Sequence, residues 1–264
     1  MSAPWLAARG ADAARLAAGE HSDPHAVLGA HPATREQAGG ARESGLVVRA
    51  YHPDATGADL LLEQGGALPM EALGDGLFAA FVPGAAFPLR YRLRFRFANG
   101  DAWEREDPYR FPPTVGELDL HLFGEGTHRR LWRVLGAHPM TIDGVAGTRF
   151  AVWAPNARRV SVIGHFNRWD GRVYPMRSLG ASGVWELFVP GVGAGDLYKY
   201  ELLTREGQPR VKTDPFARML EQPPGNASIV VPDDRYAWGD DDWMRRRAAR
   251  PAEELGHEPV AIYE

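Results

Sequence analysis

The clearest pattern of apolar and polar positions in the chain is a strict alternation in its first half. Residues 91–97 read Tyr-Arg-Leu-Arg-Phe-Arg-Phe, and a period of two predicts a strand with one buried face and one wet face. Apolar runs at 46–51, 59–63 and 77–82 predict further short strands, and Asn99-Gly100 predicts a hairpin turn. Short strands separated by turn residues favour a β-sandwich.

Both ends of the chain depart from this β pattern. Residues 4–18 are rich in Ala, Leu and Arg, which predicts a helix that stops at Gly19. Residues 233–258 are charged and polar, as expected of a linker. The last residues, 259–264, read Pro-Val-Ala-Ile-Tyr-Glu and predict a buried strand that begins a further domain.

The pattern of the first half returns in the second half at one common offset. A shared offset over several motifs predicts two tandem copies of one β-domain. We therefore expect an all-β protein with a short N-terminal helix and two β-sandwiches, at 1–110 and 135–232, with a connector at 111–134 and a linker at 233–264. The motifs that recur 107 positions later are Leu28-Gly29-Ala30-His31-Pro32 (135–139), Phe81-Val82-Pro83-Gly84 (188–191), Tyr91 (Tyr198) and Asp107-Pro108-Tyr109 (Asp214-Pro215-Phe216).

One loop distinguishes the two copies. The second copy carries His165-Phe166-Asn167-Arg168-Trp169 after a predicted strand, where the first copy offers Glu63-Gln64-Gly65-Gly66 without an aromatic residue. An exposed Trp among polar side chains suits a sugar, because the flat ring stacks on a pyranose and the polar groups take its hydroxyls. The alternative is that Trp169 closes the end of the sandwich, but a structural plug would be expected in both copies. We expect Gly164 to let the backbone turn into this loop.

A second set of candidate residues lies on a predicted strand of the same copy. In Tyr198-Lys199-Tyr200, strand alternation places both tyrosines on one face and Lys199 on the other. If the tyrosines are buried, Lys199 is free to donate hydrogen bonds to sugar hydroxyls; the alternative is an ordinary solvated lysine. Trp153 and Trp185 stand in apolar runs and are expected in the core.

Composition narrows the function classes. The 264 residues have a net charge of −4 and no cysteine, which argues against a nucleic-acid surface and excludes disulfides and cysteine-based zinc sites or nucleophiles. No apolar run approaches the ~18 residues of a membrane span, and we expect a cytoplasmic protein. No pair of carboxylates stands in a catalytic motif, and His21, His25 and His31 lack metal-ligand spacing. We expect no catalytic residue, no cofactor and no metal.

Together these features resemble the N-terminal half of bacterial 1,4-α-glucan (glycogen) branching enzymes of glycoside hydrolase family 13. The second copy alone is similar to family-48 carbohydrate-binding modules, which also precede isoamylases and trehalohydrolases. The motifs that carry the resemblance are Asp23-Pro24-His25-Ala26-Val27-Leu28-Gly29-Ala30-His31, His121-Leu122-Phe123-Gly124-Glu125-Gly126, Phe150-Ala151-Val152-Trp153-Ala154-Pro155-Asn156-Ala157, Phe166-Asn167-Arg168-Trp169-Asp170-Gly171, Gly183-Val184-Trp185-Glu186-Leu187-Phe188-Val189-Pro190-Gly191 and Lys212-Thr213-Asp214-Pro215-Phe216-Ala217.

The resemblance implies two immunoglobulin-like sandwiches, the second a glucan-binding module, in front of a catalytic (β/α)8 barrel that this chain lacks. The family moves an α-1,4-glucan segment to an α-1,6 position with carboxylates that all lie in the barrel, so the chain alone is expected to be inactive. The implied partners are α-1,4-glucan (glycogen, malto-oligosaccharides) and that barrel, with no nucleic acid or membrane.

The same resemblance supplies the candidate site. Trp169 and Lys199 occupy positions that contact glucan in relatives, Asn226 is near another such position, and Asn167 stands in the same loop. A second stacking Trp, expected shortly before Asp214-Pro215, is replaced by Pro209-Arg210-Val211. Three alternatives stay open: structural domains without a ligand, the N-terminal part of another family-13 enzyme, and a free-standing glucan-targeting protein.

Overall fold

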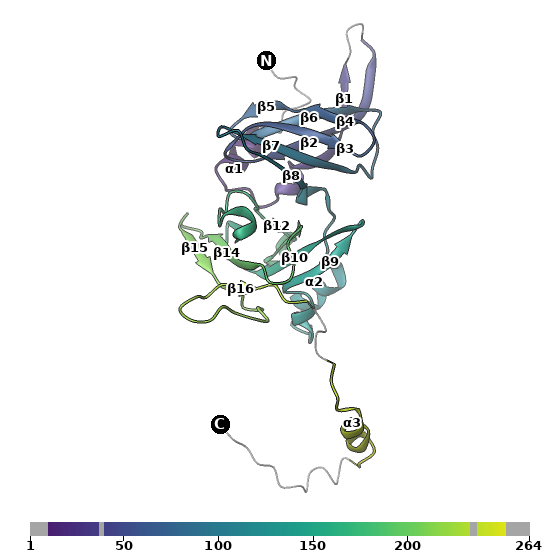
Figure 1. The fold of residues 1–264 in the computed structure, drawn as a ribbon, viewed down its shortest axis with the longest axis vertical. Helices are drawn as coiled ribbons and strands as arrows, with labels where there is room; N and C mark the ends of the chain where they lie inside the picture. The colour runs from purple at the N-terminus through teal and green to yellow at the C-terminus, as the bar shows by residue number, and fades with distance from the viewer. Residues whose placement is uncertain (1–9, 37–39, 233–236, 252–264) are drawn as a thin grey trace. The chain divides into compact units, whose positions relative to one another are not determined.

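The computed structural model describes residues 10–36, 40–232 and 237–251. The chain divides into two compact units, Met1–Pro232 and Asp233–Glu264. Four antiparallel sheets, two from each half of the first unit, confirm the predicted all-β class with two sandwiches (Figure 1). Within the described residues there is no barrel, and no helix is long and apolar enough to cross a bilayer.

The first sandwich consists of eight strands in two sheets, ordered β1-β2-β6-β5 and β4-β3-β7-β8. The predicted alternation is confirmed in β7, where Tyr91, Leu93 and Phe95 are buried. These side chains pack against residues of the opposite sheet, which include Val48 and Phe78. The strands are β1 (Gly29–Glu36), β2 (Arg42–Tyr51), β3 (Ala55–Leu62), β4 (Gly66–Pro69), β5 (Glu71–Gly74), β6 (Leu77–Pro83), β7 (Tyr91–Phe97) and β8 (Ala102–Glu106).

The second sandwich repeats this plan with one sheet ordered β12-β13-β10-β9 and another ordered β11-β14-β15, in which β16 also pairs with β14. Its core joins Phe150 and Leu187 from one sheet to Val162, Tyr198 and Tyr200 from the other. The strands are β9 (Gly136–Ile142), β10 (Val145–Trp153), β11 (Arg159–Gly164), β12 (Arg177–Ser178), β13 (Val184–Pro190), β14 (Leu197–Leu203), β15 (Pro209–Lys212) and β16 (Ser228–Ile229).

Three short α-helices accompany the sheets in the described part of the chain. The predicted N-terminal helix is present as α1 (Gly10–Ala17), while residues 1–9 lie outside the described part of the chain. The connector contains α2 (Glu117–Gly124), whose Leu120 and Phe123 pack on Ala151 and Val184 of the second sandwich. The predicted linker contains α3 (Asp241–Ala248). The strand predicted at 259–264 lies outside the described residues, and the exact domain boundaries stay predictions.

The two sandwiches contain the same hydrogen-bonded cluster, formed by a tyrosine and the aspartate of the Asp-Pro motif. Tyr91 donates its hydroxyl proton to the buried carboxylate of Asp107 at 2.6 Å, and the backbone N–H of Tyr109 donates to the same carboxylate at 3.0 Å. In the second copy Tyr198 donates to Asp214 at 2.7 Å, and the N–H of Phe216 donates at 2.8 Å. Each Asp-Pro motif therefore fastens the end of its sandwich to a core strand.

The two sandwiches share a buried boundary inside the first unit. Leu28 and Tyr109 of the first half belong to the same apolar cluster as Val162 and Tyr200 of the second. Arg105 donates to the hydroxyl of Tyr174 at 3.2 Å. This boundary is a packed apolar contact with a hydrogen bond beside it. The two sandwiches therefore share part of their core.

The structure corrects the expectation for one tryptophan. Trp185 is buried as predicted, at 3% exposure, and its indole N–H donates to the carbonyl of Ala154. Trp153 was expected in the core but is 53% exposed. It is the last residue of β10, where the strand leaves the sheet, and its ring meets the edge of Phe123 at 5.9 Å. An apolar run therefore predicted the strand correctly but not the burial of its final side chain.

The buried Tyr–Asp bond makes a testable prediction about stability. Asp107→Ala leaves the hydroxyl of Tyr91 and the N–H of Tyr109 buried without an acceptor, so we expect the free energy of unfolding to fall by about 2–4 kcal/mol. Urea unfolding of the full chain measures this. The matched control is Asp101→Ala, an exposed aspartate that bonds only within its hairpin, and it should change stability by less than about 0.5 kcal/mol. Equal midpoints for both variants would contradict the assignment.

The lowered pKa of His52 leads to a second prediction, about how the free energy of unfolding depends on pH. Burial among Phe95, Phe97 and Trp103, followed by the positive charge of Arg105, lowers the pKa of His52 to about 4. A histidine with a depressed pKa in the folded state stabilises the fold fully above pH 6.5 and loses that contribution as the pH falls towards 4. Between pH 7.5 and pH 5 we expect His52 alone to remove about 2 kcal/mol of stability.

The test compares His52→Asn with the wild type at both pH values. Asn retains an acceptor for the N–H of Asp54, which donates to Nδ1 of His52 at 3.2 Å, but it does not titrate. The variant should therefore show about 2 kcal/mol less loss of stability on acidification. His121→Gln, at an exposed site, should retain the wild-type dependence. If His52→Asn loses as much free energy of unfolding between pH 7.5 and pH 5 as the wild type does, the prediction is wrong.

Candidate functional site

The aromatic loop begins where β11 ends and is shaped by the side chain of Asn167. A short helical turn (His165–Asn167) follows Gly164. Asn167 is 3% exposed, and its amide accepts from the N–H of Gly164 at 2.9 Å while donating to the carbonyls of Val162 and Asp170. These bonds join the loop to the end of β11. Asn167 therefore shapes the loop, and its buried amide is not part of the exposed surface.

The next two residues adopt a rare backbone conformation. Arg168 and Trp169 both lie in the left-handed region, with φ of 57° and 61°, and the N–H of Asp170 donates to the carbonyl of Asn167 at 3.1 Å. This is a turn that normally requires glycine or asparagine. The other left-handed non-glycine residues in the described ranges, Asp75 and Asp143, are each followed by glycine. The Arg-Trp pair therefore costs backbone energy, which points to a role for its side chains.

Gly164 is required at the start of the loop for space and not for an unusual turn. Its φ of −173° is extended backbone that any residue adopts. An added Cβ would lie 2.3 Å from the carbonyl oxygen of Leu197 and 2.4 Å from the ring of Phe166. The chain does turn directly after Gly164, as expected, but the glycine is needed for space, and the left-handed backbone lies at Arg168 and Trp169.

Trp169 is only partly buried. Its backbone N–H donates to the carbonyl of Gly164 at 2.8 Å, which ties it to the end of β11. The ring meets His165 edge-on at 5.4 Å. A residue that merely closed the sandwich would be fully buried, whereas Trp169 keeps some exposed surface.

Lys199 and Asn226, chosen separately from the sequence, are in contact. Tyr198 and Tyr200 are buried and Lys199 points out of the other face of β14, as predicted. The ammonium of Lys199 donates to the side-chain carbonyl of Asn226, which is exposed. Thr213 holds Asn226 in place by donating to its backbone carbonyl at 2.7 Å. The pair presents two remaining ammonium protons and an amide NH₂ towards solvent.

The register of the sheet brings the loop and this pair together. Gly164 pairs with Tyr198 across β11 and β14, so Trp169, bonded to Gly164, lies next to the strand segment that carries Lys199. Val211 stands opposite Glu201 on the same face and is 52% exposed. The register thus places the loop that carries Trp169 beside the strand that carries Lys199 and its partner Asn226, with the small apolar side chain of Val211 where relatives are expected to have a second aromatic ring.

The loop also contacts the first sandwich, which the sequence did not predict. The guanidinium of Arg168 lies over the ring of Trp103, 4.3 Å from its centroid. Arg172 donates to Asp170 at 2.6 Å and to Asp54 of the first sandwich at 3.3 Å. Burial works to raise the pKa of Asp170, but the hydrogen bonds from Arg172 outweigh it and hold that pKa below its usual value. A single chain offers no pattern that reveals contacts between distant loops.

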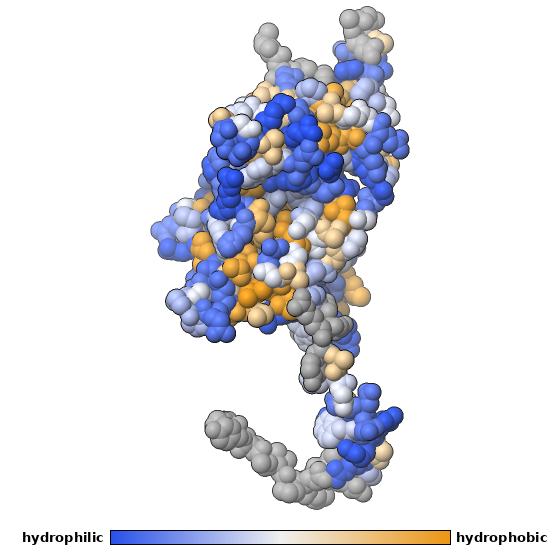
Figure 2. Space-filling view, viewed as in Figure 1, coloured by the Kyte–Doolittle hydropathy of each residue, from blue (hydrophilic) through white to orange (hydrophobic). Residues whose placement is uncertain are grey.

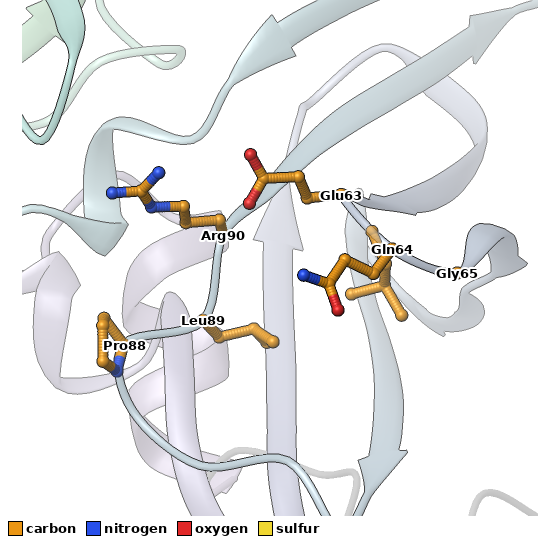
Figure 3. A pocket seen from close by; sticks show the side chains of 7 residues that line it. Glu63, Gln64, Gly65, Pro88, Leu89 and Arg90 are labelled. Atoms are coloured by element: carbon orange, nitrogen blue, oxygen red, sulfur yellow. The ribbon is translucent and has the colours of Figure 1, made fainter.

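The corresponding place in the first sandwich is chemically different. Glu63, Gln64 and Gly65 line a pocket of about 330 Å³ with Leu89 and Arg90. Figure 3 shows Gln64 and Leu89 facing each other across it. This pocket offers no aromatic platform, in line with the short, non-aromatic loop of the first copy.

Exposed apolar side chains are concentrated in the second half of the first unit. Figure 2 shows apolar surface gathered over the second sandwich, while the first is mostly polar on this side. Trp153 lines a groove of about 640 Å³ with Asn156, Arg205 and Lys212. The large exposed apolar residues of residues 10–232 are Phe87, Leu118, Trp132, Trp153, Val211, Met219 and Leu220.

The histidines weighed as metal ligands each have other contacts. The ring of His25 packs edge-on against Tyr109 at 5.1 Å, and His31 bonds to the carbonyl of Leu28 at 2.9 Å. His21 accepts from the N–H of Asp23 at 3.1 Å. Among residues 10–36, 40–232 and 237–251, no group of three or more potential ligands is placed to hold a metal ion.

Two family models match the chain. Residues 9–109 match the model of the alpha-1,4-glucan branching enzyme GlgB N-terminal domain, and residues 134–217 match that of carbohydrate-binding module 48 (isoamylase N-terminal domain). The chain is 51% identical to 1,4-alpha-glucan branching enzyme GlgB 1 of Streptomyces coelicolor over 257 residues, which are 96% of this chain and 31% of that protein. It is 45% identical to the GlgB of Myxococcus xanthus over 92% of this chain and 32% of that protein.

Solved structures add a more distant likeness. A pullulanase type I of Bacillus subtilis, crystallised with maltose, is 18% identical with a TM-score of 0.34, covering 74% of this chain and 26% of that one. The chain spans about a third of the length of the curated relatives it matches. Over that third, the chain fits the N-terminal region of a 1,4-alpha-glucan branching enzyme, with a match to the GlgB N-terminal domain followed by a match to carbohydrate-binding module 48.

Proposed function

We propose that the second sandwich binds α-1,4-glucan through Trp169, Lys199 and Asn226, as the glucan-holding part of a glycogen branching enzyme. The observation that carries the proposal is a partly exposed tryptophan held in a left-handed turn next to an outward-facing lysine–asparagine pair. A strained turn of two bulky residues has no use in a plain connection between strands. It is explained if the indole must face a ligand.

The chemistry of the three side chains fits a pyranose chain. The apolar face of a glucose ring stacks on the indole of Trp169, and sugar hydroxyls replace water on the ammonium of Lys199 and the amide of Asn226. One aromatic stack contributes only about 1 kcal/mol beyond burial, so a single short chain is expected to bind with a Kd of roughly 1 mM. Glycogen presents many chain ends, and avidity raises its apparent affinity.

In the whole enzyme the site would hold glycogen while a separate catalytic barrel transfers the segment. The names of the relatives and the family model for residues 134–217 support this assignment. On its own, the chain is proposed to bind glucan without transferring it. The cytoplasmic location expected from the sequence is part of the same proposal.

A structural role without any ligand is the alternative that one observation favours. Arg168 and Arg172 use their side chains for contacts with the first sandwich, so the loop also acts as a spacer between the sandwiches. In that case the partial exposure of Trp169 results from the packing of the loop and has no role in binding. Binding measurements separate the two roles, because a spacer has no affinity for sugar.

The decisive experiment is a titration of the full chain with maltoheptaose, followed by calorimetry or NMR. We expect weak saturable binding by the wild type. Trp169→Ala should abolish it because the stacking surface is lost, and Lys199→Ala should weaken it because a charged donor is lost. Trp153→Ala is the matched control, since it removes another exposed indole from the same sandwich and should leave the Kd unchanged.

Two outcomes would contradict the proposal. No affinity of the wild type for maltoheptaose, together with no retardation in glycogen-containing gels, would leave the structural role. Loss of binding in Trp153→Ala but not in Trp169→Ala would move the site to the groove beside β10.

A further inference from the structure

We propose that the first sandwich holds the Trp169 loop in its binding shape, with Trp103 and Asp54 as positioning residues. The inference deepens the proposed function and rests on it for the identity of the ligand. It assigns a task to the copy that has no aromatic loop of its own. Neither Trp103 nor Asp54 needs to touch the sugar.

The need for external support follows from the backbone. Two consecutive left-handed residues that are not glycine cost about 1–2 kcal/mol each, and such a conformation persists only where its surroundings hold it. The bonds of Asn167 fix the base of the turn. They do not hold the side chain of Arg168, which leaves the loop at the first left-handed position.

Trp103 supplies that support. The guanidinium of Arg168 stacks over its ring at 4.3 Å, an interaction that contributes about 0.5–1 kcal/mol at an exposed site. Trp103 is itself fixed, because its ring packs on Phe97 at 4.7 Å and on His52 at 5.8 Å. The first left-handed residue is thus held by a platform that belongs to the other sandwich.

Asp54 supports the far end of the turn. Arg172 grips the carboxylate of Asp170 with contacts of 3.0 and 2.6 Å, and its outer nitrogen also reaches both oxygens of Asp54 at 3.3 Å. The backbone of Asp54 is anchored by the bond from its N–H to His52. The turn is therefore held on both sides of Trp169 by residues that follow β2 and lie in β8.

The test that depends on no ligand is amide hydrogen exchange in the full chain. The N–H groups of Trp169 and Asp170 are bonded to Gly164 and Asn167 only while the turn is closed. Trp103→Ala should speed their exchange by about two- to fivefold, the factor that corresponds to losing the cation–π contact. Trp103→Phe restores an aromatic face and should recover most of the protection. Exchange at core amides of β14 shows whether the variant is folded.

Two variants guard this test against a general loss of stability. Asp54→Asn removes one charge at an exposed position and should speed exchange in the loop alone. Arg94→Ala removes an ion pair with Glu104 on the same sandwich and should leave the loop amides unchanged. Unchanged loop exchange in a folded Trp103→Ala chain overturns the proposal, as does equal acceleration by Arg94→Ala.

Titration with maltoheptaose then tests whether the support of the loop by Trp103 affects the affinity for glucan. Trp103→Ala should raise the Kd by about the same two- to fivefold, and Trp103→Phe should restore it. Trp103→Ala should add nothing in an Arg168→Ala background, because the two residues act as a pair. If the wild type binds no glucan, the proposed function fails while the exchange data still decide whether the first sandwich holds the loop.

Discussion

Each sandwich depends on one buried hydrogen bond between a tyrosine of a central strand and the aspartate of an Asp-Pro motif. Tyr91 with Asp107 and Tyr198 with Asp214 occupy equivalent places. Burial raises the pKa of both carboxyl groups, and the hydrogen bonds they accept work against that rise. The bond ties the end of each sandwich to its core, so the strands between can vary in their loops without losing register.

The loop after β11 in the second sandwich is one that differs between the two copies. With the strands fixed, the segment after β11 can contain a turn that is unfavourable in itself, because the buried Asn167 and the boundary with the first sandwich hold it. Elsewhere the same left-handed positions pair an aspartate with glycine, as at Asp143-Gly144. Replacing a favourable turn by an unfavourable one leaves Trp169 partly exposed, which is the difference on which the proposed binding function rests.

Much of the fold and part of the candidate site could be predicted from the sequence, but some features of the loops could not. The period of two located β7, and the common offset revealed the two sandwiches, because both are properties of the chain in order. Lys199 was placed outward correctly because Tyr198 and Tyr200 define the buried face. The exposure of Trp153 and the internal bonding of Asn167 were missed. Both depend on where the backbone goes after a strand ends, which residue spacing does not encode.

The contact between the sandwiches gives the tandem arrangement a physical meaning. A single module would have to support the left-handed pair by its own bonds, at a cost of several kcal/mol. Here His52 and Trp103 pack together in the first sandwich, and two arginines extend from the second: Arg168 reaches the ring of Trp103, and Arg172 reaches Asp54. Burial and the nearby charge of Arg105 lower the pKa of His52 to about 4, so this ring is neutral near pH 7. Under the proposed function, the first copy supports the loop and the second contacts the ligand.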